Sequence, residues 1–119
     1  MQSIKFDTCV TRVTEGKKAG LIVVRELEVG DEFTHDGKLY CLATEQVRFD
    51  SCGTGDRVRY SGCWHVVLHH GRENVLLPLK VCDDPFSEQV GSNSDYFPFP
   101  SDRVQLLTFK EIVREPVAV

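Results

Sequence analysis

The sequence lacks the features that mark membrane, secreted and zinc-ribbon proteins. No apolar run approaches the roughly 18 residues that cross a bilayer. The stretch Met1-Gln2-Ser3-Ile4-Lys5 holds no apolar signal-peptide core. The five cysteines are odd in number and widely spaced, with no C-x-x-C pair, which disfavours a disulfide framework and a zinc ribbon. We therefore expect a cytoplasmic protein with no membrane attachment, in which most cysteines are buried free thiols.

Positive charge is also scarce. The 14 Lys and Arg residues are outnumbered by 18 Asp and Glu, for a formal net charge of −4. Non-specific binding to duplex nucleic acid depends on clustered Lys and Arg, so a duplex is not an expected partner. The composition, 41% hydrophobic and 27% charged, is that of an ordinary globular protein. A chain of 119 residues is long enough for one domain with its own core.

One hairpin organises the predicted fold. Asp36-Gly37 lies between two short runs of strand-forming residues, which is the strongest short-range signal for a two-residue turn. Such a turn sets His35 opposite Lys38 and Phe33 opposite Tyr40. The two aromatic side chains then share one face of the sheet and form a stabilising cross-strand pair.

Other strands are expected on both sides of this hairpin. Apolar and polar residues alternate over residues 4–13, as in a half-buried strand, and residues 21–24 form a continuous run rich in β-branched residues, which is consistent with a central strand. Residues 57–70 are interpreted as one strand with a bulge at Ser61-Gly62. Pro78 cannot donate to a ladder, so its strand is expected at an edge or at a bulge.

We predict an all-β fold: a small single-domain barrel or strongly bent antiparallel sheet of six to seven strands over residues 1–119. At most one short helix is expected, and a strand over residues 103–115 closes the sheet in preference to a helix. The stretch Glu26-Leu27-Glu28-Val29-Gly30-Asp31-Glu32-Phe33 is similar to the turn that leads into a strand in many small barrels, including SH3-like and PUA-like domains. This similarity carries no functional residue with it.

A long acidic loop at residues 83–102 interrupts the strand pattern. It holds five acids, three prolines and no basic residue, and connections of this length are often functional or disordered. Within it, Tyr96, Phe97 and Phe99 alternate with prolines that limit the entropy lost on binding. One interpretation is that they bind a protein partner or a second copy of the chain. The other is that they fold back and close an end of the barrel.

A metal site is the first chemical alternative. On a strand, Cys63, His65 and His69 lie on one face, and thiolate and imidazole are ordinary zinc ligands. Zinc is therefore the alternative to a chain without cofactor, although the spacing matches no established metal motif. The simpler interpretation is an ordinary strand with Trp64, Val66 and Leu68 in the core.

A small-ligand or single-stranded nucleic-acid site is the second alternative. Arg57 and Arg59 share a strand face, and Trp64 is close enough in sequence to supply a stacking ring. The simpler interpretation is a solvated strand face.

Taken together, the sequence favours a binding or interaction module over an enzyme. The expected partner is a protein or a second copy of the chain. A metal- or small-ligand-binding barrel, enzymatic or not, and an oligonucleotide binder are the alternatives.

Overall fold

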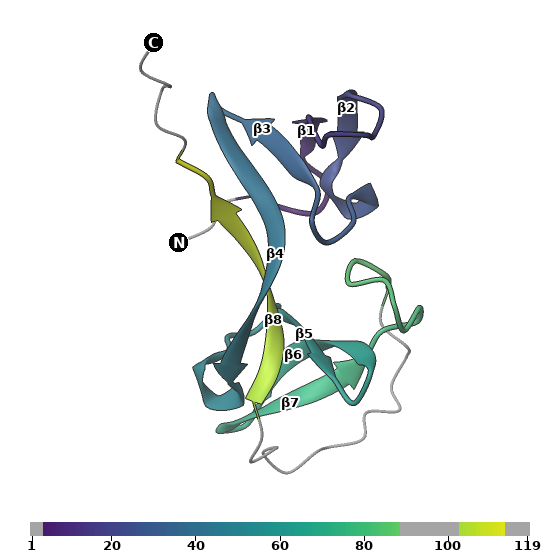
Figure 1. Ribbon diagram of the computed structural model, residues 1–119. Helices are drawn as coiled ribbons and strands as arrows, with labels where there is room; N and C mark the ends of the chain where they lie inside the picture. The colour runs from purple at the N-terminus through teal and green to yellow at the C-terminus, as the bar shows by residue number, and fades with distance from the viewer. Residues whose placement is uncertain (1–3, 89–102, 114–119) are drawn as a thin grey trace. The chain divides into compact units, whose positions relative to one another are not determined.

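The computed structural model describes residues 4–88 and 103–113, and these residues form an all-β protein. The strands follow one another in a single antiparallel sheet in the order β2-β1-β3-β4-β8-β5-β6-β7 (Figure 1). The predicted fold class is confirmed, with eight strands in place of six or seven. Their bounds are β1 Cys9–Arg12, β2 Gly20–Val23, β3 Glu32–His35, β4 Lys38–Arg48, β5 Arg57–Tyr60, β6 Cys63–His70, β7 Glu73–Pro78 and β8 Arg103–Glu111, with single 3-10 turns at Val24–Glu26 and Phe49–Ser51.

The chain divides into two compact units. Unit 1 comprises Met1–Ala43 and Thr108–Val119, and unit 2 comprises Thr44–Leu107. Strands β4 and β8 each contribute residues to both units, so the two units share strands of one sheet. The single domain predicted over residues 1–119 stays a prediction.

The hairpin of β3 and β4 has the predicted register. His35 pairs with Lys38 and Phe33 pairs with Tyr40. Asp36 and Gly37 both have positive φ, 50° and 77°, as a turn that matches the twist of the flanking strands requires. The Phe33 and Tyr40 rings are stacked with centroids 5.7 Å apart, and the hairpin therefore supplies part of the core of unit 1.

That core is apolar, with Phe33 and Leu42 at its centre and Tyr40 and Phe109 partly exposed. Phe33 and Leu42 are 0% exposed, and the Phe109 ring meets Phe33 edge-on at 6.0 Å. Aromatic pairs in this geometry contribute beyond their buried area. The remaining buried apolar residues of unit 1 are Ile4, Val10, Val24 and Leu27.

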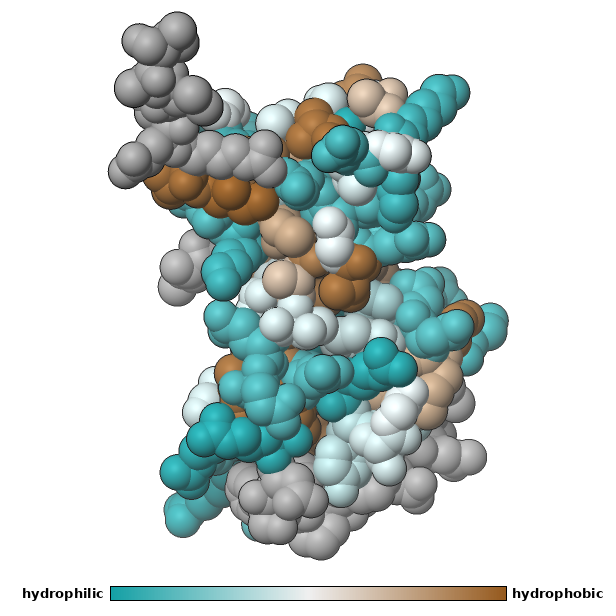
Figure 2. Space-filling model, viewed as in Figure 1, coloured by the Kyte–Doolittle hydropathy of each residue, from teal (hydrophilic) through white to brown (hydrophobic). Residues whose placement is uncertain are grey.

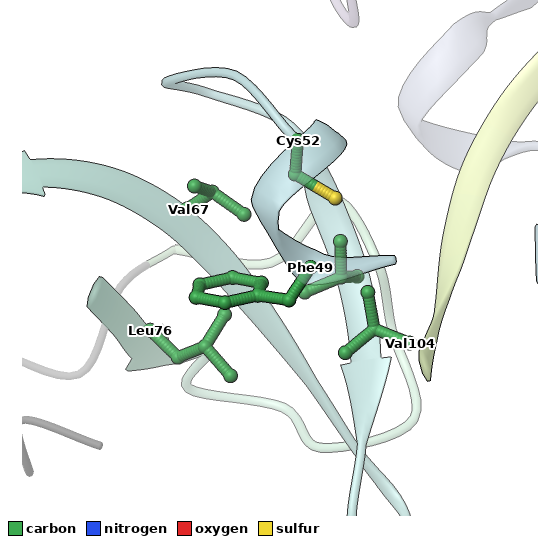
Figure 3. Packing of buried hydrophobic residues seen from close by; sticks show 6 residues of the cluster. Phe49, Cys52, Val67, Leu76 and Val104 are labelled. Atoms are coloured by element: carbon green, nitrogen blue, oxygen red, sulfur yellow. The ribbon is translucent and has the colours of Figure 1, made fainter. Parts of the chain in front are cut away.

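Unit 2 buries both faces of its central strand. On one face the Phe49 ring lies against Leu76 and Val67, with Val104 and Cys52 beside them (Figure 3). On the other face Trp64, Val66, Leu77 and Leu79 form a second cluster. Successive residues of β6 therefore point into two cores, and the run from Trp64 to Val67 is buried throughout.

Residues 57–70 form two strands, where the sequence predicted one strand with a bulge. Tyr60 pairs with Cys63 across the two-residue turn Ser61-Gly62. Ser61 and Gly62 have φ of 54° and 81°, so the turn is of the same kind as Asp36-Gly37. This hairpin accounts for the additional strand. The edge position predicted for the strand that holds Pro78 is confirmed, because β7 is last in the sheet.

No helix among residues 4–88 and 103–113 is long and apolar enough to cross a membrane.

Candidate interaction surface

The backbone of β2 is open on one side. The strand stands at one end of the sheet order, and within residues 4–88 and 103–113 its only neighbour is β1. The N–H of Val24 donates to the carbonyl of Thr8 at 2.9 Å, and Ile22 pairs with Val10 in the same register. Hydrogen-bonded and non-bonded pairs alternate along an antiparallel ladder. The N–H and C=O groups of Leu21 and Val23 therefore point away from the sheet.

A row of apolar and weakly polar side chains begins at this edge. Leu21 is 82% exposed and pairs with Thr11 of β1, which in turn pairs with Thr34 of β3. Paired residues point to the same face of the sheet, so these three form a row across the strands. An open depression of about 560 Å³ covers this face, lined by Cys9, Val10, Thr11, Leu21, Thr34, His35, Asp36 and Gly37.

On the face drawn in Figure 2, apolar residues lie in small groups separated by hydrophilic ones. In general, an open strand edge can add a strand of another chain through backbone hydrogen bonds, with pockets for alternate side chains.

A buried carboxylate fixes the turns next to β2. Asp31 is 1% exposed and accepts hydrogen bonds from the Lys17 ammonium at 2.8 Å, the Glu28 N–H at 2.8 Å and the Thr14 hydroxyl at 3.1 Å. Burial by itself would raise the pKa of Asp31, but these donors together lower it. Asp31 therefore stays ionised and ties the turn between β1 and β2 to the turn before β3.

Cys63 is part of a disulfide, which removes its thiolate from the predicted metal set. Cys9, Cys41 and Cys52 are free, as expected for most of the cysteines, but of these three Cys52 alone is buried. Cys63 is bonded to Cys82, 19 residues further on, with the Cα atoms 4.6 Å apart. A cysteine in a disulfide presents no thiolate to a metal. A correct prediction of how β6 pairs with β7 would have indicated the Cys63–Cys82 disulfide. The register pairs His65 with Pro78, which brings the chain just beyond Leu79 back to Cys63.

The two histidines of the predicted metal set lie in different surroundings. His65 is 5% exposed, with Nδ1 2.8 Å from the Cys63 carbonyl oxygen, and burial lowers its pKa. His69 is exposed, with Nδ1 3.3 Å from Oδ1 of Asn74. Within the described residues, no three His, Cys, Asp or Glu side chains are grouped as a metal site requires.

The three residues of the predicted ligand set, Arg57, Arg59 and Trp64, share a sheet face but differ in exposure to solvent. The cross-strand pairs put both arginines on the Trp64 face of the β5–β6 hairpin. Trp64, however, is 3% exposed and packs in the core with Val66. It offers no stacking ring to a nucleic-acid base, which corrects that part of the prediction. Arg57 is half-buried; burial lowers its pKa, and Asp84 opposes this shift.

The predicted partner-binding residues Tyr96, Phe97 and Phe99 lie outside the described residues. The β2 edge was not predicted as a site. Residues 21–24 were expected to form a central strand, and only the strand order reveals that this apolar run stands at an end of the sheet.

Comparison of the chain with protein-family models, with curated proteins and with solved structures finds no match.

Proposed function

We propose that this chain is a protein-interaction module that binds an extended protein segment by adding it as a strand to β2. The observation that carries the proposal is the open edge, where Leu21 and Val23 direct their backbone N–H and C=O groups away from β1. Strand addition uses such groups for affinity and takes specificity from pockets for alternate side chains. The depression that Leu21 helps to line is suited to receive side chains of the added strand and so to provide specificity.

The proposal retains the interaction class favoured by the sequence and moves the binding surface to unit 1. The aromatic segment with Tyr96, Phe97 and Phe99 stays a separate prediction for a second contact with the partner. A cytoplasmic location also stays a prediction. The Cys63–Cys82 disulfide weighs against it, because structural disulfides are rare in reducing compartments.

Selection of peptides from a random library displayed on phage tests the proposal without knowledge of the natural partner. The matched pair of proteins is Val23→Pro and Val23→Thr. The first removes one outward donor, and Val23 already has φ of −80°, which proline adopts without strain. The second keeps both the donor and the β-branched shape.

We expect enriched peptides with alternating apolar residues that bind wild type and Val23→Thr and lose at least about tenfold in affinity on Val23→Pro, equivalent to one unmade hydrogen bond of about 1.4 kcal/mol. Peptides that bind Val23→Pro as well as wild type, or no enrichment over several rounds, would overturn the binding of peptides from other proteins at β2.

A further inference from the structure

The two ends of the sheet differ in how they are protected from other chains. Natural proteins protect edge strands with charged residues and proline. Strand β7, at one end of the order, begins with Glu73 and ends with Pro78. Strand β2, at the other end, reads Gly-Leu-Ile-Val and has neither. The unprotected end also carries Leu21, the exposed apolar side chain of the strand.

We propose that β2 pairs with β2 of a second copy of this chain, antiparallel, about a two-fold axis at Ile22. This inference rests on the proposed function, since it names the segment that is added to the edge. With Ile22 opposite Ile22 of the second copy, Leu21 lies opposite Val23 of that copy, and the reverse. Both residues direct their backbone groups outward, so each of these two pairs exchanges an N–H···O=C bond in both directions.

The side chains support this register. Leu21 and Val23 of the second copy then lie side by side on the same face, which covers apolar surface that is 82% exposed at Leu21. Neither residue carries charge, and both are well suited to strands. The pairing adds no polar group that lacks a partner.

Charge favours the antiparallel direction. Lys18 precedes β2, and Arg25 and Glu26 follow it, all three exposed. Antiparallel pairing in this register brings Lys18 of one copy to Glu26 of the other, twice over by symmetry, and brings Arg25 to the uncharged Ala19. Parallel pairing would bring like ends together.

The assembly closes at two copies. An isologous interface uses the same patch on both chains and leaves none free, and the β7 end is protected by Glu73 and Pro78. Four residues per strand make a small interface, well below the standard size of stable complexes. We therefore expect a weak dimer with a Kd on the order of 100 µM.

Sedimentation velocity over a concentration series up to about 1 mM, a range that brackets this Kd, tests the inference on the purified chain. The variants are Val23→Pro, its control Val23→Thr, and Leu21→Lys, which adds a repelling charge at the edge. Val81→Lys is the control for added charge, because Val81 is 47% exposed and belongs to unit 2. Thermal unfolding of each variant shows whether it is folded, and Leu21→Lys decides the result if Val23→Pro is not.

We expect dimer formation in wild type, Val23→Thr and Val81→Lys, and at least a tenfold higher Kd in Val23→Pro and Leu21→Lys. A wild-type monomer at every concentration would overturn self-pairing and leave peptide binding at β2 intact. A dimer unchanged in both edge variants would place the contact elsewhere and overturn the inference. Dimers sensitive to Val23→Pro, with no enriched peptides, would uphold the inference while the broader proposed function failed.

Discussion

Asp31 is a carboxylate that is removed from water and yet ionised. Lys17, Glu28 and Thr14 supply the donors that hold it. Because the pKa of Asp31 is lower in the folded chain than its ordinary value of 3.8, its contribution to stability is present above pH of about 4. It is lost as the pH falls through the folded-state pKa.

Replacement of this carboxylate tests that contribution. We expect Asp31→Asn to lower the free energy of unfolding by about 1 to 3 kcal/mol at pH 7. The amide oxygen is uncharged and accepts hydrogen bonds more weakly than a carboxylate oxygen, and the amide NH2 group cannot accept them at all. The difference from wild type should shrink as the pH falls below 3.8 and through the folded-state pKa, where the wild-type carboxyl takes up a proton. Urea unfolding over a series of pH values below 7 measures it.

Asp36→Asn is the control, because the Asp36 side chain is 86% exposed, and surface changes of this kind stay within about 0.5 kcal/mol. An Asp31→Asn effect of equal size at pH 7 and pH 2.5 would contradict an electrostatic role.

His65 gives a second pH effect in a separate range. Burial lowers its pKa below the ordinary 6.5, so the unfolded chain binds the proton more readily. Stability therefore falls as the pH drops below about 6.5. We expect His65→Phe, which keeps a ring beside Tyr60, to flatten the slope of unfolding free energy between pH 7 and pH 5. The control His69→Gln, at an exposed position, should keep the wild-type slope; an unchanged slope in His65→Phe would show that His65 is not the titrating group.

At the scale of strands, the residues in the turns explain which strand boundaries and registers are predicted correctly from the sequence and which are not. Asp36-Gly37 has the residues most typical of a turn with positive φ, so the register of its hairpin was predicted correctly. Ser61-Gly62 makes the same turn with a serine, which rarely takes positive φ, and a bulge was predicted in its place. The strand predicted over residues 4–13 is shortened to Cys9–Arg12. Before it, the Thr8 N–H donates to the Lys5 carbonyl and the Thr8 hydroxyl accepts from the Lys5 N–H.

The candidate site was less predictable because it depends on neighbours. An apolar run such as Leu21-Ile22-Val23-Val24 is typical of a central strand, and the strand order alone places it at an edge. His65 and Trp64 were easy to find in the sequence. Their burial in unit 2 results from sheet faces that are both covered, which alternation along one strand does not reveal.

The Cys63–Cys82 disulfide links the start of β6 to the segment that follows β7 in unit 2. It closes a loop between Cys63 and Cys82, 19 residues apart, and a loop of this length is stabilised by about 3 kcal/mol. We expect the double variant Cys63→Ser/Cys82→Ser to lose about that much stability in urea, followed by Trp64 fluorescence. Thiol titration of the denatured chain should find the three free cysteines Cys9, Cys41 and Cys52 before reduction and all five afterwards. Five reactive thiols without reductant would refute the pairing, and Cys9→Ser, at an exposed free thiol, should leave stability unchanged.

At the scale of the whole molecule, the open question is whether two compact units unfold as one. Strands β4 and β8 continue from one unit into the other, so the two units are joined through the backbone of two strands. Chains of this size usually unfold in a single cooperative transition. Trp64 is the one tryptophan and is buried in unit 2, which makes its fluorescence a local reporter.

Leu42→Ala tests this coupling, because Leu42 is 0% exposed, lies on β4 and belongs to unit 1. We expect the truncation to cost about 2 to 5 kcal/mol and to shift the Trp64 fluorescence transition in urea by the same free energy as the transition followed by far-UV circular dichroism. Leu21→Ala, at an exposed position in the same unit, is the control and should shift neither. A Trp64 transition that stays at its wild-type midpoint in Leu42→Ala, while the circular dichroism signal shifts, would mean that the units unfold independently. The chain would then consist of two domains, and the edge strand β2 would belong to the one that is destabilised.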